Sequence, residues 1–152
     1  MLVRPHLIAS LMLLLAAVAV RAEDAPATQP TTQPAAIQAS DTDAITAKKG
    51  EIVTVEGVVE RAEWSKSGKV LNLYFKEANK DADVMASAFS KNREKLDAAF
   101  EGDAAAHWTG AKIRITAKIE PYGGKVESMK NRLQMVIQNP EQVVIVEPAP
   151  KP

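Results

Sequence analysis

Apolar and polar residues alternate in three separate stretches of this chain, and this period of two constrains the fold more than any other feature. The stretches are residues 51–64, 70–76 and 112–119. A period of two is that of a half-buried β-strand, so each stretch predicts a strand of an all-β domain. The predicted inward faces are Val53, Val55, Gly57 and Val59, then Leu71, Leu73 and Phe75, then Ile113, Ile115, Ala117 and Ile119; Thr54, Glu56 and Glu60 form the opposite face of the first strand.

Gly57 lies in the middle of the first predicted strand. Glycine weakens strand pairing, but it suits a bulge or a sharp bend in a coiled strand. We therefore predict such a distortion at Gly57. Ser67 and Gly68 then provide the turn into the second strand.

The middle of the chain has a less regular period. Residues 83–89 predict a short third strand, and residues 90–101 predict a helix that Ser90 caps and Gly102 ends. The following residues, 103–110, form a polar loop in this interpretation. Helix therefore interrupts the strands after the third.

The end of the domain returns to strands. Tyr122-Gly123-Gly124-Lys125 predicts a tight hairpin turn, because paired glycines accept positive φ angles. Residues 132–138 and 141–147 then predict the last strand and its extension, interrupted at Asn139-Pro140. The predicted order is three strands, a helix and two strands.

That order is the layout of the OB-fold, a five-stranded Greek-key barrel with one helix between strands 3 and 4. The sequence also resembles the small bacterial OB-fold domains grouped as nucleic-acid-binding-like, over most of residues 50–147. The matching positions are Ser65, Gly68, Lys69, Leu73 and Phe75 of a Ser-x-x-Gly-Lys-x-x-x-Leu-x-Phe hairpin, then Gly110, Tyr122 and Gly124, then Pro140 and Gln142. Ala111 and Ala117 stand where the pattern has glycine. These are turn and core positions, so the resemblance favours a fold more than an activity.

The two ends differ in composition from the domain. Residues 1–22 combine Arg4, an apolar run and a small residue at Ala22, which predicts a secretory signal peptide and hence an exported protein, periplasmic or secreted. A retained membrane anchor is the alternative. Residues 23–40, rich in Thr, Gln and Pro, predict a disordered linker, and residues 148–152 a disordered tail. One domain, residues 41–147, remains.

The residue types needed for common catalytic sites are scarce. The chain has no cysteine, which excludes disulfides, thiol chemistry and cysteine metal sites. After removal of the signal peptide the one histidine is His107, beside Trp108 in an Ala-rich loop, where a surface role is favoured over a catalytic base. We expect no enzyme and no cofactor.

One acidic cluster resembles part of a metal site. Residues 79–84, NKDADV, have the alternating oxygen side chains that open a calcium loop. That loop requires glycine at its sixth position and glutamate at its twelfth, where this chain has Val84 and Ser90. A solvated turn is favoured over weak calcium binding, and we expect no resident metal.

Binding is the remaining class of function. OB-folds bind ligands on the second and third strands and the flanking loops, and single-stranded nucleic acid is held there by aromatic stacking and by cations. Without Arg4 and Arg21 the chain has 17 basic and 19 acidic residues, so binding of nucleic acid or another polyanion depends on local arrangement. The predicted ligand-binding residues are Trp64, Lys66, Lys69, Asn72, Tyr74, Lys76, Tyr122 and Lys125.

Each aromatic also has a structural interpretation. Trp64 suits the closed end of a barrel, Tyr74 suits a strand surface beside lysine stems, and Tyr122 suits the packing of its own turn. A charged strand face also serves solubility. The alternative function is therefore an interaction module for an envelope protein or a small ligand, without nucleic-acid binding.

Overall fold

The computed structural model describes residues 35–76 and 84–150. The predicted signal peptide, the linker up to residue 34 and the calcium-like cluster up to residue 83 lie outside the described residues. Within the described ranges, no helix has both the length and the apolar character needed to cross a membrane.

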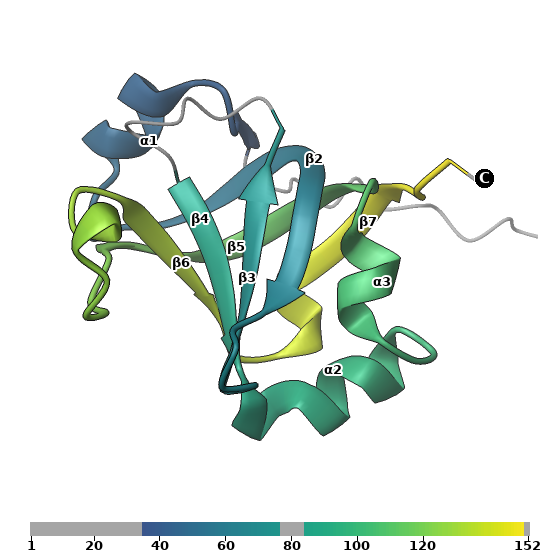
Figure 1. Ribbon diagram of the computed structural model, residues 1–152. Helices are drawn as coiled ribbons and strands as arrows, with labels where there is room; N and C mark the ends of the chain where they lie inside the picture. The colour runs from purple at the N-terminus through teal and green to yellow at the C-terminus, as the bar shows by residue number, and fades with distance from the viewer. Residues whose placement is uncertain (1–34, 77–83, 151–152) are drawn as a thin grey trace, which may run out of the picture. The chain divides into compact units, whose positions relative to one another are not determined.

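Five strands form a closed barrel (Figure 1). They are β2 (Ile52–Trp64), β3 (Val70–Phe75), β4 (Val84–Phe89), β5 (Lys112–Pro121) and β6 (Leu133–Ile137). β3 lies between β2 and β4, β6 lies between β4 and β5, and β5 closes the barrel on β2. The β4–β6 pair is parallel, and the other barrel pairs are antiparallel. This order and the parallel pair are those of the OB-fold, so the predicted fold is confirmed.

The apolar faces of the strands fill the barrel as their alternation predicted. Leu71 and Leu73 of β3 are fully buried, and so are Ile113, Ile115 and Ile119 of β5. Burial of each such side chain stabilises the fold by about 1.5–3 kcal/mol. The chain has no cysteine, so packing stabilises this core without disulfides.

Gly57 permits close packing and is not the site of a bulge. β2 keeps a continuous register with β5 across this glycine, and its register shift lies between Val59 and Arg61, against β3. A Cβ on Gly57 would lie 2.7 Å from Cβ of Ala39 and 2.9 Å from the ring of Phe75. Of the predicted bulge or bend at Gly57, the bulge is therefore wrong, since the register shift lies farther along the strand. The glycine is required by its neighbours.

The folded part of the chain extends beyond both predicted domain boundaries. β1 (Ile37–Gln38) pairs in parallel with β2, and Ala39 is 2% exposed. At the other end, Ala149 packs against the core. Residues 35–40 and 148–150, predicted as disordered linker and tail, therefore belong to the folded unit, because apolar side chains in both segments contact the barrel.

The connection between β4 and β5 is helical, as predicted, but it continues beyond the predicted helix. A 3₁₀ turn, η1 (Ser90–Asn92), begins at Ser90 without a side-chain cap and leads into α2 (Arg93–Ala99). A further helix, α3 (Ala104–Trp108), occupies the predicted polar loop. Asp103 caps α3, since its carboxylate accepts a hydrogen bond from the N–H of Ala105 at 3.0 Å. A short helix before the barrel, α1 (Thr42–Ala47), is likewise absent from the sequence interpretation.

The connection between β5 and β6 is a loop of residues 122–132 and not the predicted tight hairpin. It contains the 3₁₀ turn η2 (Glu127–Met129). Neither Gly123 nor Gly124 has a positive φ angle. A Cβ on Gly124 would collide with the ring of Tyr122, so this glycine lets the tyrosine fold back on its own loop.

The last strand has the predicted extension. β6 pairs with the C-terminal half of β5, and β7 (Val143–Glu147) pairs with its N-terminal half. Between them, η3 (Pro140–Gln142) contains the proline. The side-chain amide of Gln142 fixes the interruption, because it donates to the carbonyl of Thr116 at 3.0 Å and to that of Val136 at 3.3 Å.

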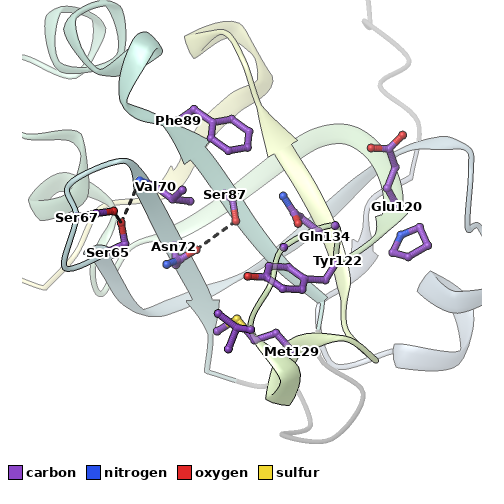
Figure 2. Close-up of a pocket in the computed structure, with 14 residues that line it drawn as sticks. Ser65, Ser67, Val70, Asn72, Ser87, Phe89, Glu120, Tyr122, Met129 and Gln134 are labelled. Atoms are coloured by element: carbon purple, nitrogen blue, oxygen red, sulfur yellow. Dashed lines mark hydrogen bonds between the residues drawn. The ribbon is translucent and has the colours of Figure 1, made fainter.

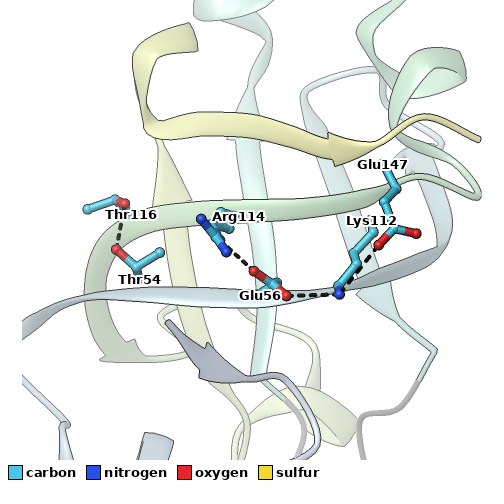
Figure 3. Close-up of polar contacts among 6 residues, drawn as sticks. All are labelled: Thr54, Glu56, Lys112, Arg114, Thr116 and Glu147. Carbon is cyan, nitrogen blue, oxygen red and sulfur yellow. Dashed lines mark hydrogen bonds and ion pairs between the residues drawn. The ribbon is translucent and has the colours of Figure 1, made fainter. Parts of the chain in front are cut away.

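Glu56 lies on the predicted outward face of β2 but is only 5% exposed (Figure 3). Its carboxylate accepts hydrogen bonds from Nζ of Lys112, at 3.0 Å, and from Nε of Arg114. Lys112 also lies 3.7 Å from Glu147. The hydrogen bond from Lys112, and next that from Arg114, lowers the pKa of Glu56, and the bond to Glu56 raises the pKa of Lys112. The basic residues of β5 therefore serve an ion-pair network on this side of the barrel.

Candidate ligand-binding face

A concavity lies on the outer surface of β3, β4 and β6, between two connections (Figure 2). One wall is the hairpin of residues 65–69, and the other is the loop of residues 122–132. The volume is about 510 Å³, within the usual range of about 300–1,000 Å³ for ligand sites. We call this concavity the face pocket.

Neutral polar side chains form the floor of the face pocket. Asn72 of β3 lies opposite Ser87 of β4, and the Ser87 hydroxyl donates to Oδ1 of Asn72 at 3.4 Å. Gln134 of β6 projects into the same region (Figure 2). Within the described part of the chain, the Gln134 amide has no hydrogen-bond partner, although the residue is 9% exposed. The floor therefore presents amide and hydroxyl groups to a ligand.

The walls add aromatic and apolar surface and little charge. Phe89 and Tyr122 contribute rings, and Val126 and Met129 contribute aliphatic surface from the loop. Among the lining residues, Glu120 alone carries charge, and it pairs with Lys118 at 3.0 Å. The interior of the face pocket therefore suits a flat, neutral group better than an anion.

Five of the predicted binding residues lie in the segments that form this face. Asn72 and Tyr122 line the face pocket. Lys66 lies between two lining residues of the hairpin, and Lys125 between two lining residues of the loop. Lys69 lies at the base of the hairpin, in an adjacent hollow that includes Phe89.

Tyr74 lies on the same outer surface but outside the face pocket. It pairs with Arg61 of β2 and Met85 of β4, and the guanidinium of Arg61 covers its ring at 4.5 Å from the centroid. Burial raises the pKa of Tyr74. One ring face is therefore occupied within the protein. Lys76, the last described residue after β3, is exposed beyond it.

Trp64 is not brought to the binding face. It pairs with the fully buried Leu71 and packs against the core. Arg93 of α2 covers its ring at 4.7 Å from the centroid, and Nε1 is buried without a partner among the described residues. This position corresponds to the structural interpretation of Trp64, at the closed end of the barrel.

The sequence interpretation missed Ser87, Phe89 and Gln134. Residues 84–88 are buried on both sides of the sheet, so β4 lacks the alternation that distinguishes an inner from an outer face. Gln134 lies in β6, of which Leu133, Met135 and Ile137 belong to the barrel core. For Ser87 and Phe89 the one signal was that the predicted third strand borders the binding face; for Gln134 it was a polar residue between the core residues Leu133 and Met135.

Four lysines without ion pairs lie on the segments that border the face pocket. Lys66, Lys69 and Lys125 are exposed and form no salt bridge with any described residue, and the same holds for Lys91, which follows β4. By contrast, Lys130 of the loop pairs with Glu127. The four unpaired cations are available to an anionic ligand. No group of three or more potential metal ligands occurs among the described residues.

Comparison with solved structures finds the same fold within longer chains. A chain from Leishmania major Friedlin assigned as an aspartyl-tRNA synthetase matches with a TM-score of 0.53 at 16% identity, over 84% of this chain and 24% of that one. The aspartyl-tRNA synthetase of Entamoeba histolytica matches with a TM-score of 0.53 at 14% identity, over 83% and 24%. This chain therefore spans about a quarter of their length, and the likeness concerns the fold. No protein-family model and no curated protein sequence matches the chain.

Proposed function

We propose that this chain is a non-catalytic OB-fold module that binds single-stranded nucleic acid on the face formed by β3, β4 and β6. The observation that carries the proposal is the combination of a neutral pocket with unpaired lysines around it. An unpaired base presents a flat ring with donors and acceptors on its edge, whereas its phosphate needs cations. The face pocket offers the first environment, and Lys66, Lys69, Lys91 and Lys125 offer the second.

The combination of a neutral pocket for the base and lysines for the phosphate favours nucleic acid over other polyanions. A ligand with charge alone would gain from the lysines but not from the rings and amides of the face pocket. Tyr122 and Asn72 are therefore expected to contribute to nucleic-acid affinity through the base. The fold neighbours are named as tRNA synthetases, which is consistent with a nucleic-acid ligand for this fold.

A second candidate is a small neutral ligand or an envelope protein. The observation in its favour is that the lysines lie outside the face pocket, whose lining includes no cation among the described residues. A ligand confined to the face pocket would bind independently of salt concentration. Salt dependence therefore separates the two candidates.

Fluorescence anisotropy with labelled single-stranded DNA and RNA at low salt tests the proposal. We expect dissociation constants of about 1–100 µM for the wild-type chain, weakening with salt. Tyr122→Ala is expected to weaken binding about tenfold by removing base contacts. Lys66→Gln and Lys125→Gln are each expected to reduce the slope of log affinity against log salt by about 0.7.

Lys95→Gln is the matched control, because Lys95 bonds to Asn139 near α2, away from the face pocket. It should leave affinity and slope unchanged. Failure of the wild-type chain to bind any oligonucleotide at low salt would contradict the proposal. Salt-independent capture of a neutral compound by the same pocket would favour the second candidate.

The proposed location is outside the cytoplasm, periplasmic or secreted. The support is the sequence pattern of residues 1–22, with its basic start, apolar run and small residue at Ala22. We expect the mature chain to begin at Glu23. Mass spectrometry of the protein purified from an envelope or secreted fraction measures this directly. A chain that keeps Met1 and stays in the cytoplasm would contradict export, whereas Met1 on a membrane-bound chain indicates a retained anchor.

A further inference from the structure

Phe89 separates two concavities on the binding face. It lines the face pocket, and it also lines an adjacent hollow of about 440 Å³ with Lys69, Ser90 and Lys91. Figure 2 shows Phe89 at one end of the face pocket and Met129 at the other. A ligand that extends from the pocket into the hollow therefore has to pass over this ring.

Phe89 is the one residue of β4 that is not buried. Phe89 is 38% exposed and lies outside the core, whereas Ala86 and Ala88 of the same strand are buried in it. Among the described residues, no other ring or cation stacks on it. An exposed ring beside a pocket is a feature of interaction sites.

Two cations flank the ring. The N–H of Ser90 donates to the carbonyl of Lys69 at 2.9 Å, which holds the base of the hairpin against the end of β4. Lys69 and Lys91 thus line the hollow together with Phe89, and neither forms an ion pair with a described residue. An aromatic ring next to free ammonium groups is the arrangement that holds a stacked base and its phosphate.

We infer that Phe89 is the stacking residue over which the bound strand passes from the face pocket to Lys69 and Lys91. One nucleotide places its base in the face pocket, and its neighbour stacks on Phe89 with its phosphate against the two lysines. This inference rests on the proposed function. It assigns stacking to Phe89 and not to Tyr74, because Arg61 already covers one face of the Tyr74 ring.

Four variants of the full chain test the assignment by anisotropy with the same labelled oligonucleotides. Phe89→Ala is expected to weaken binding about tenfold, Phe89→Trp to keep it, and Phe89→Leu to behave like Phe89→Ala, because stacking needs a ring. Tyr74→Ala is expected to stay within about twofold of wild type. Val144→Ala, on the outer surface of β7 and 46% exposed, is a control away from this face.

Thermal unfolding of each variant separates loss of binding from loss of fold, because a variant that unfolds at the wild-type temperature keeps the barrel. Replacement of Lys69 and Lys91 by glutamine is expected to reduce the salt slope by about 0.7 for each lysine. Wild-type binding that survives in Phe89→Ala, or that Phe89→Leu retains in full, overturns the stacking role and leaves the proposed function standing. Absence of wild-type binding overturns both.

Discussion

Replacement of Trp108 by alanine is expected to lower the free energy of unfolding by about 3–5 kcal/mol. Trp108 is fully buried at the end of α3, and its ring meets that of Phe100 edge-on, with centroids 5.2 Å apart. α3 lies beside β2 (Figure 1), and the backbone after α3 is bonded to β2 at Val59. Removal of the indole leaves a large cavity between this helix and the barrel, and chemical denaturation followed by far-ultraviolet circular dichroism measures the loss.

Two further substitutions control this experiment. Trp108→Phe should cost less than Trp108→Ala, because it keeps much of the apolar volume and removes the indole N–H, which is buried without a partner among the described residues. His107→Ala, at the exposed neighbouring position, should change the free energy of unfolding by less than about 0.5 kcal/mol. Equal stability of Trp108→Ala and His107→Ala would show that α3 does not stabilise the barrel.

Replacement of Glu56 by glutamine is expected to lower the free energy of unfolding by about 2 kcal/mol at neutral pH. The substitution keeps the shape of the side chain and removes the charge that Lys112 and Arg114 share. The side chains of Lys112 and Arg114 are 31% and 37% exposed. Water therefore partly solvates these cations when the carboxylate charge is removed, which limits the destabilisation. Glu60→Gln, exposed on the same strand, is the matched control and should have little effect.

The contribution of Glu56 should depend on pH. Its folded pKa lies below the ordinary value of 4.5, so the unfolded state binds the proton more readily. The stabilisation is therefore present above pH 4.5 and lost as pH falls through the lower folded pKa. Urea denaturation across this range should show the difference between wild type and Glu56→Gln shrinking under acid conditions. A difference that stays constant down to about pH 3 would show that Glu56 does not act through its charge.

The binding face was only partly predictable from the sequence. Asn72 could be assigned because β3 alternates clearly between inner and outer residues. Tyr122 could be assigned because it is the aromatic residue of the loop that precedes β6. Trp64 also lies in an alternating strand, β2, but it pairs with Leu71, which faces the interior. Its side chain therefore lies on the inner side, where Arg93 covers the ring. Alternation thus assigns a side to a residue only while the strand keeps its register, and β2 shifts register between Val59 and Arg61, just before Trp64.

Other residues depended on contacts between distant segments. Ser87 and Phe89 lie in β4, whose sequence shows no clear period, and Gln134 lies in the short strand β6. The three residues reach one pocket because β4 pairs with both β3 and β6. The loop of residues 122–132 has the glycines of a tight turn, but Tyr122 packs on Gly124 and the chain continues to Arg132 before pairing resumes. The packing of the Tyr122 side chain therefore determines the conformation of this loop more than the turn preference of its two glycines does.

The sequence by itself determined the strand faces, the order of strands and helix, and hence the OB-fold, because burial of alternate side chains is a local property of each strand. Only the tertiary structure decided that Glu56 is buried between two cations, that Gly57 makes room for Ala39, and that Phe89 stands between the face pocket and two free lysines. Each of these depends on side chains far apart in the chain, and closure of the barrel brings them together.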